Sequence, residues 1–235
     1  MRVNRGWRAG VVAVALVLAS ALPAVAQAWT EYKNVEDGFS IVFPGTPTVM
    51  AITWKTQLGF MLPARIYSAE RQGGRFTVTV VDYAGIEAQA KERIKTCDPG
   101  SDTCLGSRLS GEAYWRHEVR GALLDATFRF LKRGAELTHL QWNHMDLVEG
   151  HMLSLTDPKD GARTYAFVAM REMKLYIIEG TVPKNAPEPG LFQQSLGWVE
   201  KDGTPIRYET IYSNQFHGLK QYPAPANTRA TPARR

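Results

Sequence analysis

The chain has 235 residues, 44% of them hydrophobic, and a formal net charge of +5. Six of its 28 basic residues lie in the first eight residues and in the last seven. The segment 29–222 therefore carries 22 basic against 23 acidic residues and is close to neutral. A nucleic-acid-binding protein concentrates basic residues on its folded body, so this balance excludes that class of partner.

The first 28 residues have the pattern of a secretory signal peptide. Three arginines precede an apolar run over 9–22, and Ala26-Gln27-Ala28 supplies small residues for cleavage near Ala28. The run is too short for a transmembrane helix, which needs about 20 apolar residues, and no cysteine follows it for acylation. We expect a mature protein without a transmembrane segment, located in the periplasm or secreted.

Removal of the leader leaves 207 residues, a length that suits one domain with a full hydrophobic core. We predict a single domain over 29–222, followed by a disordered Pro/Ala/Arg tail over 223–235. Cys97 and Cys104 are the only cysteines. In an oxidising compartment they predict one structural disulfide that closes a small polar loop, worth roughly 2.5 kcal/mol, while a metal or redox pair is the alternative.

Hydrophobic alternation and turn residues predict four strands in the first half of the chain, with Gln72-Gly73-Gly74 as a hairpin turn. A surface helix over 86–96 follows. A longer helix is predicted between an N-cap at Ser110 and a C-terminal glycine at Gly134, with one packed and one solvated face. The four strands are expected at 39–43, 49–56, 64–71 and 75–83.

The pattern returns to strands after Gly134. The arms 163–170 and 174–182 form the strongest predicted hairpin, and the second is almost continuously apolar, as a central strand would be. The remaining predicted elements are strands at 137–148 and 151–155, a helix at 191–199 and a final strand at 206–212. Because hairpins dominate, we predict an α+β fold with a mainly antiparallel sheet and helices packed on its faces.

Two segments resemble the PsbP/Mog1-like superfamily. The run 37–47, Asp-Gly-Phe-Ser-Ile-Val-Phe-Pro-Gly-Thr-Pro, is similar to the opening strand of its exported bacterial members, and 175–180 followed by 192–196 is similar to its penultimate strand and last helix. The resemblance implies an antiparallel sheet between helical layers. It also implies a binding or assembly module without a shared catalytic site, so it transfers no site residues.

Chemical motifs are sparse in the sequence. His139 and His144 are five residues apart on a predicted strand and so face opposite sides, whereas His151 could fold back beside His144 and Asp146 as a metal site. Neither G-x-S-x-G, S-x-x-K, H-E-x-x-H nor a phosphate-binding glycine loop occurs. No catalytic, cofactor-binding or metal residues are therefore assigned.

Five tryptophans remain after the leader, and most are predicted to be core residues. Trp115 lies on the packed stripe of the long helix, Trp142 is in phase with Leu140, and Trp198 ends a predicted helix. Trp54 is the candidate for an exposed aromatic residue.

These observations predict an exported, non-enzymatic binding or accessory protein of the cell envelope that needs no cofactor. Its partner is another envelope protein or a small ligand. The alternatives are a small metal-dependent hydrolase that uses His144, Asp146 and His151, and a carrier with an apolar pocket between sheet and helix.

Overall fold

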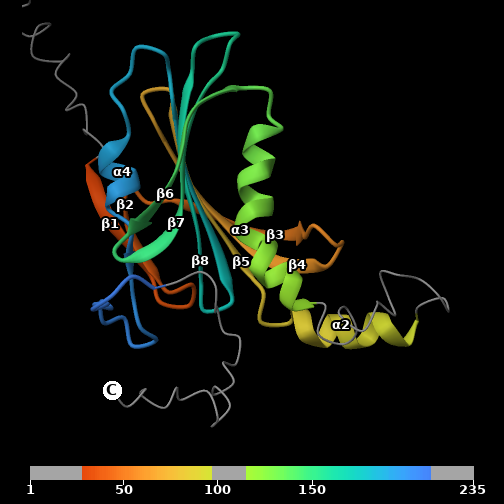
Figure 1. Cartoon of the computed structure of the whole chain (residues 1–235). Coiled ribbons are helices and arrows are strands. Elements are labelled where there is room, and N and C mark those ends of the chain that lie inside the picture. Colours follow the sequence, from red (N-terminus) through yellow and green to blue (C-terminus); the bar gives the residue numbers. More distant parts are fainter. Residues whose placement is uncertain (1–27, 97–114, 213–235) are drawn as a thin grey trace, which may run out of the picture.

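The computed structural model describes residues 28–96 and 115–212, which form two antiparallel sheets and three helices (Figure 1). Within these residues no helix is long and apolar enough to cross a membrane. The predicted leader, the cysteine loop with Cys97 and Cys104, and the predicted tail lie outside the described residues. The elements are β1 (Trp29–Asn34), β2 (Phe39–Pro44), β3 (Thr48–Lys55), β4 (Met61–Arg71), β5 (Gly74–Asp82), α2 (Ile86–Lys95), α3 (Trp115–Leu131), β6 (Glu136–Met145), β7 (Val148–Thr156), β8 (Arg163–Arg171), β9 (Lys174–Val182), α4 (Gly190–Gln194) and β10 (Gly197–Trp198).

The large sheet joins two runs of hairpins. Its strand order is β3-β4-β5-β9-β8-β7-β6, so β3 to β5 form one run, β6 to β9 form the other, and β5 pairs with β9. That junction extends from Arg75 opposite Thr181 to Asp82 opposite Lys174. The predicted α+β class, the predicted hairpins and the central position of β9 are confirmed.

The large sheet lies between two different covers (Figure 1). Helix α3 packs over β7, β8 and β9, and Trp115 and Phe130 belong to the hydrophobic core on that face. The opposite face is covered by a small sheet of order β1-β2-β10 and by α4, with Phe39, Phe192 and Trp198 buried in a second core. Only one face therefore has the helical layer that the resemblance implied, because a sheet covers most of the other.

Three two-residue turns each connect the two strands of a hairpin in the large sheet. Gln72-Gly73, Asp146-Leu147 and Glu172-Met173 all have positive φ at both positions, the conformation of a type I′ turn. Glycine makes this conformation easy in the first turn, which the sequence indicated. The other two turns place Leu147 and Met173 in a conformation that such residues rarely adopt. The predicted hairpin 163–170/174–182 still brackets Glu172-Met173, whereas the predicted strand 137–148 ran through the turn at Asp146-Leu147 and was wrong there.

The start and end of the domain differ from the prediction. Strand β1 was missed, because it is an edge strand whose exposed positions carry charges, among them Glu31 and Lys33. The predicted helix 191–199 ends at Gln194, and β10 follows because Trp198 inserts into the second core and donates a hydrogen bond from Nε1 to the Met145 carbonyl (3.1 Å). The predicted strand 206–212 is wrong: it makes only an isolated bridge, between Tyr212 and Val148.

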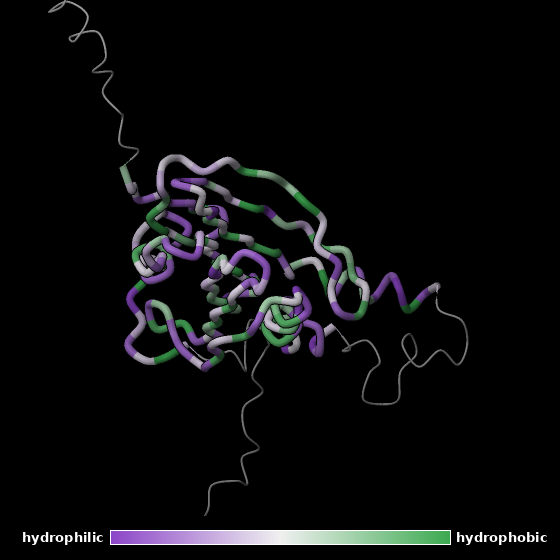
Figure 2. Tube along the Cα trace, turned by 90° about the horizontal axis from the view of Figure 1, so that it is seen from above, coloured by the Kyte–Doolittle hydropathy of each residue, from purple (hydrophilic) through white to green (hydrophobic). Residues whose placement is uncertain are grey.

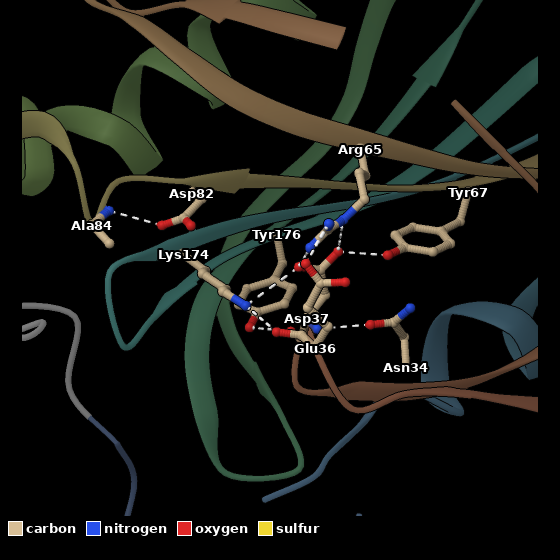
Figure 3. Close-up of polar contacts among 9 residues, drawn as sticks. All are labelled: Asn34, Glu36, Asp37, Arg65, Tyr67, Asp82, Ala84, Lys174 and Tyr176. Atoms are coloured by element: carbon tan, nitrogen blue, oxygen red, sulfur yellow. Dashed lines mark hydrogen bonds and ion pairs between the residues drawn. The ribbon is translucent and has the colours of Figure 1, made fainter. Parts of the chain in front are cut away.

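A buried carboxylate fastens the small sheet to the large one (Figure 3). Asp37, in the turn between β1 and β2, is 2% exposed. Arg65 on β4 donates to both of its oxygens, and the Tyr67 hydroxyl donates to Oδ2 at 2.5 Å. On β9, Lys174 forms an ion pair with Oδ1 at 3.3 Å, and the Tyr176 hydroxyl donates to the Asp37 carbonyl at 2.7 Å.

Burial by itself raises the pKa of Asp37, but the hydrogen bonds from Arg65 and Tyr67 and the charge of Lys174 together lower this pKa below its ordinary value. The cluster therefore favours an ionised Asp37. Because both carboxylate oxygens already accept hydrogen bonds, we interpret this cluster as a structural clamp.

We expect Asp37→Asn to lower the free energy of unfolding by about 3 kcal/mol at pH 7, because it leaves Arg65 and Lys174 without their buried partner. The pKa of Asp37 is lower in the folded state than in the unfolded state, where it is about 3.9. The ionised carboxylate therefore stabilises the fold above the unfolded pKa, and this contribution is lost as the pH falls through the folded pKa. Urea unfolding of both proteins should show a difference that shrinks below about pH 4. Asp82→Asn is the matched control, since within the described residues the Asp82 carboxylate accepts a hydrogen bond only from the Ala84 backbone. An equal loss in both variants would contradict the clamp.

Candidate functional site

An apolar groove lies between α3 and the edge strand β6. Its volume is about 280 Å³. Half of the twelve exposed large hydrophobic residues in the described chain belong to this region. We call these six residues the α3–β6 face: Leu124, Phe128, Leu131, Leu137, Leu140 and Trp142.

The face exists because α3 is displaced from β6. The helix packs mainly on β8, with β7 and β9 beside it, whereas β6 is the outermost strand. Leu153 and Leu155 on β7 are fully buried under the helical layer, while their partners on β6, Leu140 and Leu137, remain exposed. The hydrophobic side of the sheet therefore extends further than its cover.

A register shift in β6 keeps its apolar residues on one side. Between Leu137 and His139 the pairing with β7 skips Thr138. This extra residue is the arrangement of a β-bulge, so Leu137 lies on the same side of the sheet as Leu140 and Trp142. Without the bulge, Leu137 would face the opposite side, because side chains alternate along a strand.

Helix α3 carries a second apolar stripe. Trp115, Val119 and Phe130 are buried as predicted, but Leu124 and Phe128 are 66% and 50% exposed and Leu131 is also exposed. Figure 2 looks nearly along the helix axis and shows hydrophobic residues around much of the circumference of the helix. The predicted solvated side of the helix is exposed, as Arg116 and Arg120 show, but it is not wholly polar. Leu124, Phe128 and Leu131 are exposed apolar residues that line the groove.

Three polar residues line the groove: Thr127, Gln141 and His151. The Gln141 side chain alternates with those of Leu140 and Trp142 and donates to Met152 Sδ at 3.7 Å, so Thr127 and His151 supply the polar side chains. The Thr127 hydroxyl donates to the Leu123 carbonyl and also contacts His151 Nδ1, both at 2.9 Å. Burial lowers the pKa of His151, and the charge of Glu149 opposes this effect without cancelling it. A neutral imidazole is therefore favoured at pH 7.

Two charged side chains lie at the rim of the groove. Lys132 stacks over the Phe128 ring, with Nζ 4.5 Å from its centre. Glu149 accepts a hydrogen bond from Trp142 Nε1 at 3.2 Å. Each of these two charged side chains contacts an aromatic residue of the groove. The residues that line the groove include no Asp, Glu, Lys or Arg.

The structure does not bring the three proposed metal ligands together. His151 lies on the α3 side, bonded to Thr127, and the His144 ring contacts Trp142 with centroids 6.1 Å apart. Asp146 sits in the turn after β6 and lies near Gly197 of the small sheet, on the opposite side of the large sheet. Within the described residues no group of three His, Cys, Asp or Glu side chains could hold a metal ion.

The burial of the tryptophans agrees with the prediction at two positions and differs from it at two others. Trp115 and Trp198 are buried as expected. Trp142 is in phase with Leu140 as predicted, but it is 56% exposed rather than a core residue. Trp54 is half-buried under the guanidinium of Arg129, whose Cζ lies 4.3 Å from the ring centre.

Sequence reasoning allowed an apolar pocket between sheet and helix as an alternative but did not locate it, because it assigned most apolar residues of α3 and β6 to the core. The signal that could have found it is the excess of apolar residues on α3. Leu123 and Leu124 are adjacent and point about 100° apart, so a single buried stripe cannot hold both of them together with Phe128 and Phe130.

The two neighbouring leucines of α3 provide a direct test. Leu123 is 6% exposed, and we expect Leu123→Ala to cost about 2–5 kcal/mol through the cavity it leaves. Leu124→Ala should change the free energy of unfolding by less than about 0.5 kcal/mol, because Leu124 is largely exposed and is not one of the buried core residues. Chemical denaturation of both variants measures this, and a comparable loss for Leu124→Ala would show that the stripe serves folding.

Comparison with known proteins gives no relative on which to base an identity. No family model matches the sequence, and no curated protein is significantly similar to it.

Proposed function

We propose that the protein is a non-enzymatic binding module and that the groove of the α3–β6 face is its binding site. The observation that carries this proposal is the convergence of six exposed apolar side chains on one surface. Together they expose on the order of 600 Å² of apolar residues, at the upper end of the largest patch on a typical monomer. Such a patch is unfavourable in water, and a binding partner would remove it from solvent.

The form of the groove supports the same proposal. Ligand sites are concave, mostly apolar and lined by a few polar groups, and here leucine and aromatic side chains lie beside Thr127 and His151. The hydroxyl of Thr127 donates to a main-chain carbonyl, so it is not paired as an activated nucleophile with His151. The lining therefore supports binding better than covalent chemistry.

We further propose that the protein works in the periplasm or outside the cell and has a PsbP/Mog1-like fold. The sequence of the leader supports export. The two resembling segments support the fold, because they pack together: Phe43 and Phe192 have ring centroids 5.1 Å apart, and Ser195 Oγ accepts a hydrogen bond from the Val42 backbone at 2.9 Å.

The function is tested with the uncharged probe N-phenyl-1-naphthylamine, which fluoresces when it enters an apolar site. The protein without its leader should bind the probe, and Leu124→Ser/Phe128→Ser should weaken binding at least about tenfold, since two apolar walls are lost. The expected stability of this variant is close to that of the wild type.

The matched control is Val49→Ser/Met50→Ser, which changes two exposed apolar residues on the other edge of the large sheet. It should leave probe binding unchanged. Equal weakening by both double variants, or no binding by the wild type, would contradict the proposed site.

A further inference from the structure

The hydrogen bonds at Thr127 determine which nitrogen of His151 carries the proton. A threonine hydroxyl has one hydrogen, and the Leu123 carbonyl can only accept. Both 2.9 Å contacts of Thr127 are therefore hydrogen bonds only if its hydroxyl donates to Leu123 and His151 Nδ1–H donates to Thr127. The neutral ring then has its lone pair on Nε2.

The lone pair on Nε2 is available to a ligand. No described residue forms a hydrogen bond with Nε2. Nε2 is also not one of the buried polar atoms that lack a partner among the described residues, so it is accessible from outside the protein. His151 lines the groove and is the cross-strand neighbour of Trp142. Its Nε2 is therefore an acceptor beside an aromatic side chain.

The charges of the groove restrict the ligand further. The lining has no charged side chain, while Lys132 and Glu149 at the rim are engaged with Phe128 and Trp142. An ionised group buried there would lose its hydration without gaining a counter-ion. The volume of about 280 Å³ lies near the lower end of small-molecule sites, about 300–1,000 Å³.

We infer that the groove binds a small, uncharged, mainly apolar molecule that carries one hydroxyl or N–H donor, and that His151 Nε2 accepts this donor. This inference rests on the proposed function and specifies the class of its ligand. Thr127 is a positioning residue, because its hydroxyl donates to the Leu123 carbonyl and accepts from His151 Nδ1–H, which leaves the lone pair of His151 on Nε2.

The experiment measures calorimetric binding of three probes of similar size at pH 7: 4-butylphenol, butylbenzene and 4-butylbenzoate. The phenol should bind about 5- to 10-fold more tightly than the hydrocarbon, since one hydrogen bond satisfies an otherwise unpaired acceptor. The benzoate should bind most weakly, because it is ionised and offers no donor.

Variants identify the acceptor. His151→Phe keeps an aromatic ring and should make phenol and hydrocarbon bind equally, with little change for the hydrocarbon. Thr127→Val removes the acceptor of Nδ1–H and should reduce the preference for the phenol, whereas Thr127→Ser should restore it. His139→Phe, which changes an exposed histidine on β6, is the matched control and should leave the preference intact.

The outcomes separate the two proposals. If no apolar probe binds, the proposed function fails. If the hydrocarbon and the phenol bind equally to the wild type, or His151→Phe leaves the preference intact, the groove remains a binding site but the inference is overturned. Tightest binding by the benzoate would also overturn it, because that result requires a donor at Nε2. Folded state is checked for each variant by circular dichroism and thermal unfolding.

Discussion

A sheet with two apolar faces must be covered on both, and this constraint organises the whole domain. The strands β8 and β9 bury residues on both sides along most of their length, and β5 buries mainly one side. The chain covers one face of the sheet with α3 and the other with the small sheet and α4. Both covers are joined to the large sheet through side chains far apart in sequence. At β6 the cover ends before the apolar surface does, and the candidate site lies at that boundary.

Buried polar groups hold the covers in place. Asp37 connects the small sheet to β4 and β9 through Arg65, Tyr67 and Lys174. On the other face, Glu118 of α3 is buried and accepts a hydrogen bond from the Leu58 backbone in the loop after β3, and burial raises the pKa of its carboxyl group. Each carboxylate fastens a loop to a neighbouring layer, which suits a structural role better than a chemical one.

The groove combines two local departures from regular structure. The bulge in β6 gathers Leu137, Leu140 and Trp142 on the side that faces α3, and the second stripe of α3 provides Leu124, Phe128 and Leu131. Neither departure improves the core, because the side chains concerned stay in contact with water. These side chains lie beside the His151 imidazole, which Thr127 contacts. An apolar surface is thus combined with one directed hydrogen-bond acceptor, the combination on which ligand selectivity in a mainly apolar site depends.

Local sequence patterns determined the strands β2 to β5, β8 and β9, the helices α2 and α3 and most hairpins, because alternation, glycine turns and helix periodicity act over a few residues. They indicated β6 and β7 but misplaced the turn between them. They did not determine β1, β10 or the end of α4, where pairing with β2 and the insertion of Trp198 into a distant core decide the structure. The site was decided entirely by tertiary structure. Leu123 and Leu124, or Trp142 and Trp198, are equally apolar in the sequence. The offset of α3 from β6 leaves Leu124 and Trp142 exposed, whereas Leu123 and Trp198 enter the two cores.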